Sequence, residues 1–482
     1  MLDPVTCWQA IYTRDRRFDG RFFAAAKTTG LYCRNICPVP FARPKHIVLF
    51  PCAAAAEAAG FRPCKRCRPQ AAPGTPAWLG TSAVVSRAFR LILEGALNEG
   101  SVEQLAAKMG LGSRQLRRLF VQHLGASPLQ IAITQRIHLA LNLIEGSHFP
   151  MGEVAFCSGF KSIREFNHAI HLSLGQSPSR LRESSRRTFP AQLRQSSLEL
   201  RLPYRSPFDW EALLASLKRA AIPGVELVTD TSYQRTIEIG GAQGYFAARP
   251  DSANCQMIIN LELSSYEGLA QTVERIGRIF DLGADPVRIA SHLSQDPKLR
   301  RSVNLHPGLR VAGAWDYFET SVLAVLGQNL TTPGPKRIIA RLVKTLGTPI
   351  DTGIQGLHYL FPRPQQLAVA QLPKIGIGTA TAAALRKLIA TTIQKQLNFA
   401  ASRTLEAAVS QMSAASQIDE STANYVAMRA FGEPDAFPFR DLAIRRRLSS
   451  AQSPLSVAET RAAAEQWRPW RAYAATHLAT AL

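Results

Sequence analysis

The sequence lacks any run of about 18 apolar residues, the length that a membrane-spanning helix requires. Residues 1–20 also lack the apolar core of a signal peptide, because aspartate and arginine residues interrupt them. We therefore expect a soluble cytoplasmic protein with no membrane partner. A reducing compartment disfavours disulfides, so the eight cysteines are expected to bind metal or to stay free thiols.

Acidic residues are also scarce. The chain has 35 Asp and Glu against 57 Lys and Arg, which gives a formal charge of +22 and a pI near 10.2. Residues 1–190 alone hold 25 basic and 11 acidic residues. A polyanion is the natural partner of such a chain, and nucleic acid is the commonest polyanion. Charge alone leaves open a basic surface that binds nothing.

The length of 482 residues exceeds one ordinary domain, and the hydrophobic fraction of 46% supports real cores. Changes in composition and hydrophobic pattern divide the chain into residues 1–72, 81–186, 196–305 and 306–482. Linkers rich in Pro, Gly and Ala or in basic residues lie near 71–80 and 184–195. The predicted fold class is multidomain, mainly α with α+β parts. It comprises a small four-cysteine domain, an all-α domain, a sheet-containing α+β subdomain and a second all-α domain.

Cys33 and Cys37 form a CxxxC pair, and Cys64 and Cys67 form a CxxC pair. Two such pairs suit one tetrahedral Zn²⁺ held by four thiolates. Spacing alone favours a purely structural zinc site. The other four cysteines have no such spacing and are expected to be buried or incidental.

The sequence around the four cysteines resembles the N-terminal domain of the Ada family in two segments, DGRFFAAAKTTGLYCRNICP and AAGFRPCKRCRP. The resemblance implies repair of methyl phosphotriesters in DNA, with Cys33 accepting the methyl group and the other three cysteines remaining ligands. A thiolate is the required nucleophile, and its thioether product is inert, so the reaction is single-turnover. The lost negative charge should then strengthen phosphate binding.

Residues 81–186 contain two helix-turn-helix patterns. In the first, Ser101 and Gln104 form a capping box, and a Gly-Leu-Gly turn precedes a helix from Ser113. In the second, a turn at 158–160 precedes a helix expected to carry Lys161, Ser162 and Arg164. A long helix over about 129–145 connects them. A single pattern of this kind is weak, because helical hairpins imitate it.

The tandem arrangement, ending in GFKSIREFN and GQSPSRLR, resembles the AraC-type DNA-binding domain. The resemblance implies that the second helix of each unit enters the major groove of double-stranded DNA. We expect Arg114, Gln115, Lys161 and Arg164 to face the bases.

Residues 196–482 resemble 3-methyladenine DNA glycosylase II of the helix-hairpin-helix superfamily, through HPGLRVAGAWDYFE, SVLAVLGQNLTT and STANYVAMRAFGEPDAFPFRDLAIRRRL. The resemblance implies excision of alkylated purines by N-glycosidic hydrolysis. It places the catalytic carboxylate at Asp441, a pocket aromatic at Tyr425 and a pocket-lining polar residue at Gln328. A buried aspartate can stabilise positive charge on the sugar or orient water. The alternative is that Asp441 only caps a helix.

Two positions depart from that family's pattern. Where relatives carry a Gly-rich hairpin, this chain has Ser416-Gln417-Ile418-Asp419-Glu420, whose two acids should weaken phosphate binding. Ala479 stands where relatives have a pocket tryptophan. Trp315 and Phe318 could line the pocket or belong to the core, and Trp467 and Trp470 match structural positions.

The sequence thus supports an alkylation-repair and adaptive-response enzyme that acts on alkylated and promoter DNA. RNA polymerase is a possible partner, and a monomer suffices. The alternative is a methylation-activated transcriptional regulator whose glycosylase module is inactive. A third reading, a zinc-stabilised DNA-binding protein without chemistry, would require Cys33 to be shielded. No Pro-Cys-His-Arg motif of a methylguanine-DNA methyltransferase occurs, so we predict no repair of that lesion.

Overall fold

A computed structural model describes residues 2–69, 72, 83–188, 198–328, 334–394, 404–416, 418–449 and 453–480. Gln417 and most of both linkers lie outside these residues. The chain forms two compact units, the first comprising Met1–Ser206, Pro250–Glu274 and Leu282–Ala284, and the second the remaining segments. Among the described residues no helix is long and apolar enough to cross a membrane.

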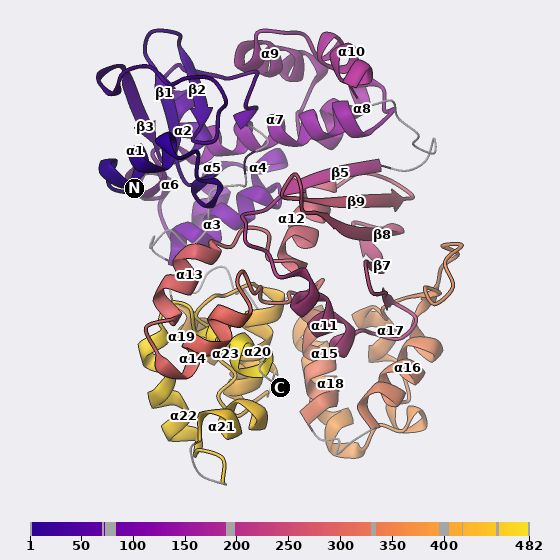
Figure 1. The fold of residues 1–482 in the computed structure, drawn as a ribbon. Helices are drawn as coiled ribbons and strands as arrows, with labels where there is room; N and C mark the ends of the chain where they lie inside the picture. Colours follow the sequence, from indigo (N-terminus) through magenta and orange to yellow (C-terminus); the bar gives the residue numbers. More distant parts are fainter. Residues whose placement is uncertain are drawn as a thin grey trace. The chain divides into compact units, whose positions relative to one another are not determined.

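The N-terminal part of the first unit contains a four-stranded sheet in the order β3-β1-β2-β4, and Figure 1 labels its strands β1, β2 and β3. Its strands are β1 Phe23–Ala26, β2 Leu31–Arg34, β3 Ile47–Phe50 and β4 Arg62–Pro63. β1 pairs antiparallel with β2 and β3, whereas β2 and β4 run parallel. α1 (Pro4–Tyr12) and α2 (Ala53–Ala58) accompany the sheet, and small alanine side chains fill much of its core.

The helical part of the first unit surrounds α7 (Pro128–Gly146), which begins with a capping box between Ser127 and Gln130. The first helix-turn-helix is α5 and α6, and the second is α8 and α9. The bounds are α3 Ala83–Leu93, α4 Ala96–Glu99, α5 Val102–Lys108, α6 Ser113–Leu124, α8 Met151–Cys157, α9 Ile163–Leu174 and α10 Pro178–Thr188.

Most of the predicted local signals in this part are confirmed. Ser101 caps α5 in a capping box with Gln104. Gly159 takes a φ of 89° in the second turn, a value that glycine adopts without strain. One expectation is wrong: Lys161 lies in the turn and not in α9. The side chain of Ser162 accepts the backbone N–H of Glu165 and so begins the helix two residues later.

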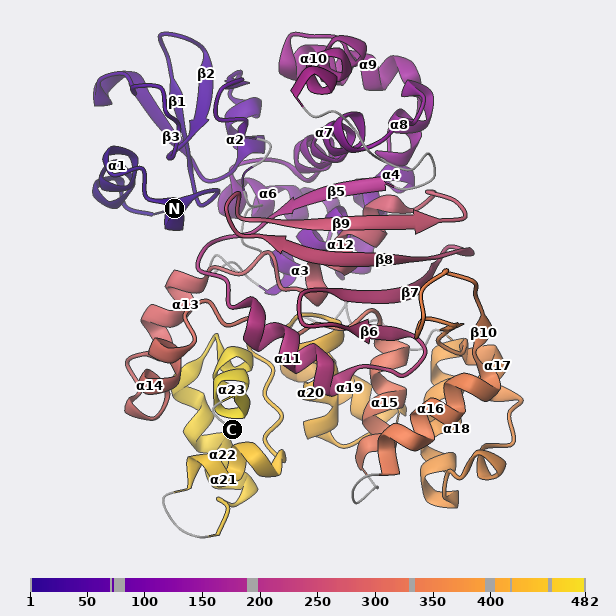
Figure 2. The same ribbon diagram turned by 45° about the vertical axis from the view of Figure 1, so that its right-hand side comes forward.

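Two strands of the predicted sheet region also belong to the first unit. β5 (Leu198–Pro203) and β9 (Gln256–Leu263) pair antiparallel, as Figure 2 shows. Buried and more exposed positions alternate along β5, as expected of a half-buried sheet, whereas β9 buries the three consecutive residues Met257, Ile258 and Ile259. α12 (Leu269–Ile279) follows them in the chain.

The second unit contains three antiparallel strands, β6 (Glu226–Val228), β7 (Tyr233–Ile239) and β8 (Ala242–Asp251). α11 (Trp210–Ala220) begins at the predicted cap Asp209. Arg235, fully buried in β7, forms ion pairs with Glu226 at 3.0 Å and with Glu319 at 2.9 Å.

The rest of the second unit is helical, with one short strand pair between β10 (Thr348–Pro349) and β11 (Tyr359–Leu360). Its helices are α13 Pro286–Leu293, α14 Pro297–Leu305, α15 Tyr317–Gln328, α16 Gly334–Leu346, α17 Pro364–Ala368, α18 Thr379–Ile393, α19 Leu405–Ser416, α20 Glu420–Ala430, α21 Leu442–Leu448, α22 Val457–Ala464 and α23 Arg471–Thr480. The predicted class, a mainly helical multidomain chain with α+β parts, is confirmed.

Candidate functional sites

The four predicted zinc ligands lie together. The Sγ atoms of Cys33, Cys37, Cys64 and Cys67 all lie within 4.8 Å of one another. Parallel pairing of β2 with β4 explains half of this arrangement, because it sets Cys33 beside Cys64, whose backbone N–H donates to the Tyr32 carbonyl at 3.0 Å. The turns that follow the two strands supply the other two sulfurs.

The residues fit one Zn²⁺. Burial, aided by charge on Cys67, raises the pKa of the Cys37 thiol to about 12. Four crowded sulfurs therefore cannot all ionise without a cation, and Zn²⁺ prefers four thiolates in such a closed cluster.

Exposure distinguishes Cys33 from the other ligands. Cys37, Cys64 and Cys67 are buried, whereas Cys33 is half-buried at the edge of the cluster. Lys65 and Arg66 beside the cluster are exposed and positively charged. A phosphate-bound methyl group could therefore approach Cys33, so the shielding that the third sequence hypothesis required is absent.

An ion pair holds the strand next to these sulfurs. The guanidinium of Arg34 pairs with Asp19, and its Nε lies 2.8 Å from the carboxylate. The backbone N–H of Arg34 lies 3.4 Å from the Cys67 Sγ, a distance suited to an N–H···S contact. Sequence reasoning missed Asp19 and Arg34, because nothing in their local spacing connects them.

The four-cysteine domain contacts the helix between the two helix-turn-helix units. Glu57 is half-buried, and its carboxylate accepts hydrogen bonds from Tyr32 Oη at 2.8 Å and from Thr134 Oγ1 of α7 at 2.6 Å. Burial raises the pKa of Glu57. Because Tyr32 directly precedes Cys33, two hydrogen bonds connect the sulfur-bearing strand with α7.

The predicted DNA-facing side chains of both helix-turn-helix units are exposed. Arg114 and Gln115 lie in the first turn of α6, and Arg164 lies in the first turn of α9. Lys161 is exposed in the turn before α9. Leu116 and Phe120 form the buried face of α6, which leaves its other face available.

The second unit contains a cavity of about 1250 Å³. Tyr425 of α20 and Asp441 at the start of α21 both line it, as do Glu319, Thr320 and Gly327 of α15. The Tyr425 hydroxyl accepts a hydrogen bond from Arg429 Nη1 at 3.2 Å. The structure thus brings together two of the three residues that the resemblance placed in a pocket.

The third residue, Gln328, ends α15 next to Gly327, and its side chain lies outside the described part of the chain. Ala479 is half-buried in α23 and is absent from the described lining of the cavity. Trp315 and Phe318 are buried core residues, as are Trp467 and Trp470. No tryptophan side chain lines the described cavity.

Asp441 is a helix cap, as the alternative interpretation predicted. Its Oδ1 accepts the backbone N–H of Ile444 at 3.1 Å. The residue is exposed and not buried in the DNA-free chain, which corrects the expectation of a buried carboxylate. The cap uses the Oδ1 atom of the carboxylate, and Asp441 also lines the cavity.

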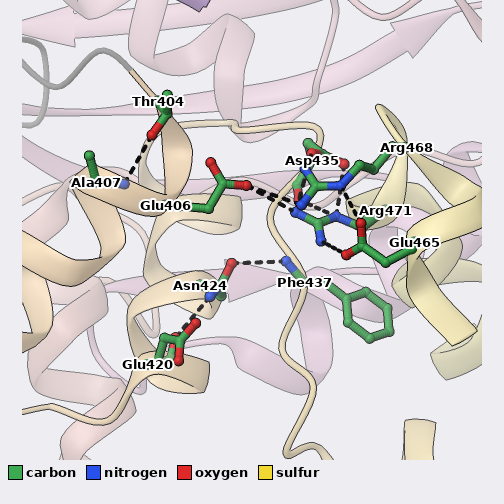
Figure 3. Close-up of polar contacts among 10 residues, drawn as sticks. All are labelled: Thr404, Glu406, Ala407, Glu420, Asn424, Asp435, Phe437, Glu465, Arg468 and Arg471. Carbon is green, nitrogen blue, oxygen red and sulfur yellow. Dashed lines mark hydrogen bonds and ion pairs between the residues drawn. The ribbon is translucent and has the colours of Figure 1, made fainter. Parts of the chain in front are cut away.

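The loop that carries Asp441 is held in place by side chains from neighbouring helices. Asn424 Oδ1 accepts the Phe437 N–H at 3.2 Å, and Ser421 Oγ accepts the Arg440 N–H at 2.9 Å. Earlier in the loop, Asp435 pairs with two arginines that also reach Glu406 and Glu465 (Figure 3). These arginines are Arg468 and Arg471.

The two acids that replace the expected glycines have partners that the sequence did not suggest. Asp419 caps α20 and lies 3.9 Å from Arg440, and Glu420 forms an ion pair with Arg461 at 2.5 Å. Glu420 therefore has a close cationic partner within the chain, and Asp419 has a more distant one.

Three family models match the chain. The Metal binding domain of Ada matches residues 6–70, a Helix-turn-helix domain matches 105–184, and the AlkA N-terminal domain matches 199–316. A Mycobacterium tuberculosis protein, "Probable bifunctional transcriptional activator/DNA repair enzyme AlkA", is 38% identical over 485 residues, covering 100% of this chain and 97% of the relative.

Two further matches concern the C-terminal part. Escherichia coli DNA-3-methyladenine glycosylase 2 is 31% identical over 58% of this chain and 95% of its own length. The solved 3-methyladenine DNA-glycosylase of Archaeoglobus fulgidus superposes with a TM-score of 0.51 at 21% identity, covering 58% of this chain and 96% of that one. The last match shows a shared fold alone.

A thiol cluster that fits zinc, two helix-turn-helix units and a glycosylase-type fold define a DNA-repair protein that also carries the DNA-binding module of a regulator. The full-length relative makes the assignment specific. The chain belongs to the family of bifunctional transcriptional activator/DNA repair enzymes of the AlkA type, whose partner is DNA.

Proposed function

We propose that the chain removes alkyl damage from DNA at two sites: Cys33 accepts methyl groups from phosphotriesters, and the cavity at Asp441 releases alkylated purines of the 3-methyladenine type. The observation that carries the first half is that Cys33 is the most exposed of four clustered sulfurs. The second half is supported by Asp441 and Tyr425 lining one cavity.

At the first site the Cys33 thiolate attacks the methyl carbon. An S–C bond forms, the C–O bond breaks, and its electron pair leaves on the phosphodiester oxygen, so no proton is needed. Bound zinc would keep the sulfurs deprotonated and ready for attack. The site loses one negative charge in this step, which favours later binding to phosphate and supports a role as a transcriptional switch.

At the second site the bond between the sugar and the base breaks, and its electron pair leaves with the alkylated base. The Asp441 carboxylate stabilises the positive charge on the sugar, and water then adds to the same carbon and loses a proton. Tyr425 would stack against the extruded base, and Gln328 would line the same pocket. Arg114, Gln115, Lys161 and Arg164 would read the promoter.

A monomer in the cytoplasm suffices for both reactions, and contact with RNA polymerase would follow from the activator role. In this proposal the functions belong to four modules, residues 1–72, 81–186, 196–305 and 306–482. One observation favours the alternative, a regulator with an inactive glycosylase: no tryptophan side chain lines the described cavity.

Base release from methylated duplex DNA tests the second site. Asp441→Asn should lower the single-turnover rate by at least about a hundredfold, since one stabilising group in a reacting site contributes that much. Asparagine is as good a helix cap as aspartate, so α21 stays intact. Asp351→Asn, at another exposed aspartate that caps a turn, is the matched control and should release base normally. Equal rates in all three proteins would exclude Asp441 as the catalytic group.

Mass spectrometry of protein mixed with DNA that carries methyl phosphotriesters tests the first site. One methyl group per chain should appear on a peptide that contains Cys33. Cys33→Ser should acquire none, whereas Cys255→Ser, at a half-buried thiol outside the cluster, should still acquire one. A methyl group on another cysteine of the cluster would reassign the acceptor.

A further inference from the structure

The free backbone N–H groups at the start of α20 donate hydrogen bonds to the side chain of the capping residue, Asp419. Asp419 Oδ1 accepts the N–H groups of Ser421 at 3.0 Å and Thr422 at 3.3 Å, and Oδ2 accepts the Thr422 hydroxyl at 2.6 Å. A DNA phosphate cannot use these N–H groups unless it displaces the carboxylate. Phosphate binding at the mouth of the cavity therefore needs another group.

Arg440 is the cation placed to supply it. The residue lines the same cavity as Asp441 and directly precedes it in the chain. Its backbone is fixed by the hydrogen bond from its N–H to Ser421 Oγ. Its side chain is 63% exposed, and its Nε lies 3.9 Å from Asp419 Oδ1, at the limit of an ion pair.

The neighbouring arginine is held more firmly. Arg461 forms its ion pair with Glu420 at 2.5 Å, and its guanidinium carbon lies 3.7 Å from the centre of the Phe439 ring. A close ion pair and a ring contact fix the Arg461 guanidinium, whereas the Arg440 guanidinium makes a long contact with Asp419 at 3.9 Å. Of the two arginines, Arg440 is the one that can change partner at low cost.

We propose that Arg440 binds a phosphate that flanks the lesion, exchanging Asp419 for the DNA backbone when the damaged nucleotide enters the cavity. The proposal rests on the proposed function in one respect, namely that Asp441 acts at the sugar. Adjacent Cα atoms lie about 3.8 Å apart, so a long side chain next to Asp441 reaches the phosphates on either side of that sugar. A guanidinium can grip phosphate with two hydrogen bonds, which a loose exposed carboxylate contact does not match.

Replacing single DNA phosphates by uncharged analogues tests whether Arg440 binds a phosphate at one particular position. Duplexes with an abasic-site analogue carry a methylphosphonate at one flanking phosphate at a time, and binding by the full chain is measured. One of these substitutions should weaken binding by the parent protein about tenfold, the value of one charge-assisted contact. Arg440→Gln should bind the charged and neutral duplexes equally well.

Arg301→Gln is the matched control, because it removes one positive charge from an exposed position on α14 that does not line the cavity. This variant should keep the full sensitivity to the neutral phosphate. If Arg440→Gln keeps that sensitivity as well, the proposal is wrong.

Asp419→Asn tests the exchange itself. Asparagine caps a helix as well as aspartate does, so the variant removes the negative charge that attracts Arg440 while α20 keeps its start. Binding should become several-fold tighter in the parent background and stay unchanged in Arg440→Gln. An equal gain in both backgrounds would mean simple repulsion between Asp419 and DNA, and would overturn the exchange.

Failure of the proposed glycosylase gives a different result. If the parent protein releases no base but still loses affinity for one neutral phosphate through Arg440, the proposed reaction fails and the phosphate contact stands. If base is released and no flanking phosphate matters to Arg440, the reaction stands and this inference fails.

Discussion

His477 is a buried histidine of α23 whose Nδ1 lies 3.1 Å from Ser302 Oγ. Burial lowers its pKa to about 4 from an ordinary value near 6.5. The folded state therefore resists protonation, and stability that is fully present above pH 6.5 is lost as the pH falls towards 4. The loss should approach about 3 kcal/mol, because each pKa unit corresponds to about 1.4 kcal/mol.

Urea unfolding at several pH values checks this expectation. In His477→Gln the free energy of unfolding of the second unit should fall less between pH 6.5 and pH 4 than in the parent protein, whatever the effect of the substitution at neutral pH. His138→Gln is the matched variant, because His138 is a half-buried residue of the first unit whose Nε2 is buried, and desolvation lowers its pKa to about 4 as well. An undiminished decline in His477→Gln would contradict the assignment.

Arg235 is the second residue with a large expected effect. It is fully buried between Glu226 and Glu319, and its guanidinium also lies 5.4 Å from the centre of the Trp315 ring. Burial raises the pKa of Glu319 to about 7, although Arg235 opposes the shift. Arg235→Met should destabilise the second unit by about 3–5 kcal/mol, since it leaves buried carboxylates without a cation.

Calorimetry measures the cost of Arg235→Met, and adding Glu319→Gln should recover part of it. No recovery in the double variant would mean that lost packing, and not the unpaired carboxylate, causes the effect.

Among the elements, β2 and α7 are connected through Glu57. Glu57 is half-buried, its carboxylate accepts hydrogen bonds from two hydroxyl groups, and desolvation raises its pKa above the ordinary 4.5. A raised folded pKa means that the contribution of Glu57 to stability is fully present below pH 4.5 and is lost as the pH rises through the folded value.

Glu57→Gln should therefore keep the first unit folded at neutral pH with equal or higher stability and remove this pH dependence. Glu57→Ala should cost about 2–3 kcal/mol, because two buried hydroxyls lose their acceptor. Thermal melts between pH 4 and 8 distinguish these results, and a stronger pH dependence in Glu57→Gln would show that the carboxylate is not the titrating group.

At the same scale, local signals were predicted well and partners from distant segments were not. Ser101 and Asp209 stand directly before amphipathic runs, so both caps could be predicted. The arginines that face Asp419 and Glu420 lie about twenty and forty residues further along the chain, and no spacing rule connects them. The sequence therefore predicts two acids that weaken phosphate binding but does not predict their arginine partners. The sequence predicts a helix that includes Lys161, whereas the side-chain cap at Ser162 makes the helix begin at Ile163.

The cysteines and Asp441 could be assigned because motifs of adjacent residues carry them. Their exposure could not be predicted, since it depends on how strands and loops pack. Cys33 is more exposed than its three neighbours, and Asp441 is exposed where a buried group was expected.

For the whole molecule, two compact units predict two unfolding transitions. A strong chelator should lower the first unit's transition, because zinc binding contributes folding energy to a closed thiolate cluster, and it should leave the second transition unchanged. Calorimetry with and without chelator checks this, and Cys64→Ser should reproduce the chelator effect. A chelator that shifted both transitions equally would show that the units unfold together.

The length of α7 has a consequence for the promoter. Nineteen residues of helix span about 28 Å, which is close to the roughly 34 Å of one turn of B-form DNA. Recognition helices held apart by one stiff rod should read two short sequence blocks on the same side of the duplex, with centres roughly 10 base pairs apart. An operator with half a turn of extra DNA between its blocks should lose one of them, because α7 cannot follow the second block around the duplex.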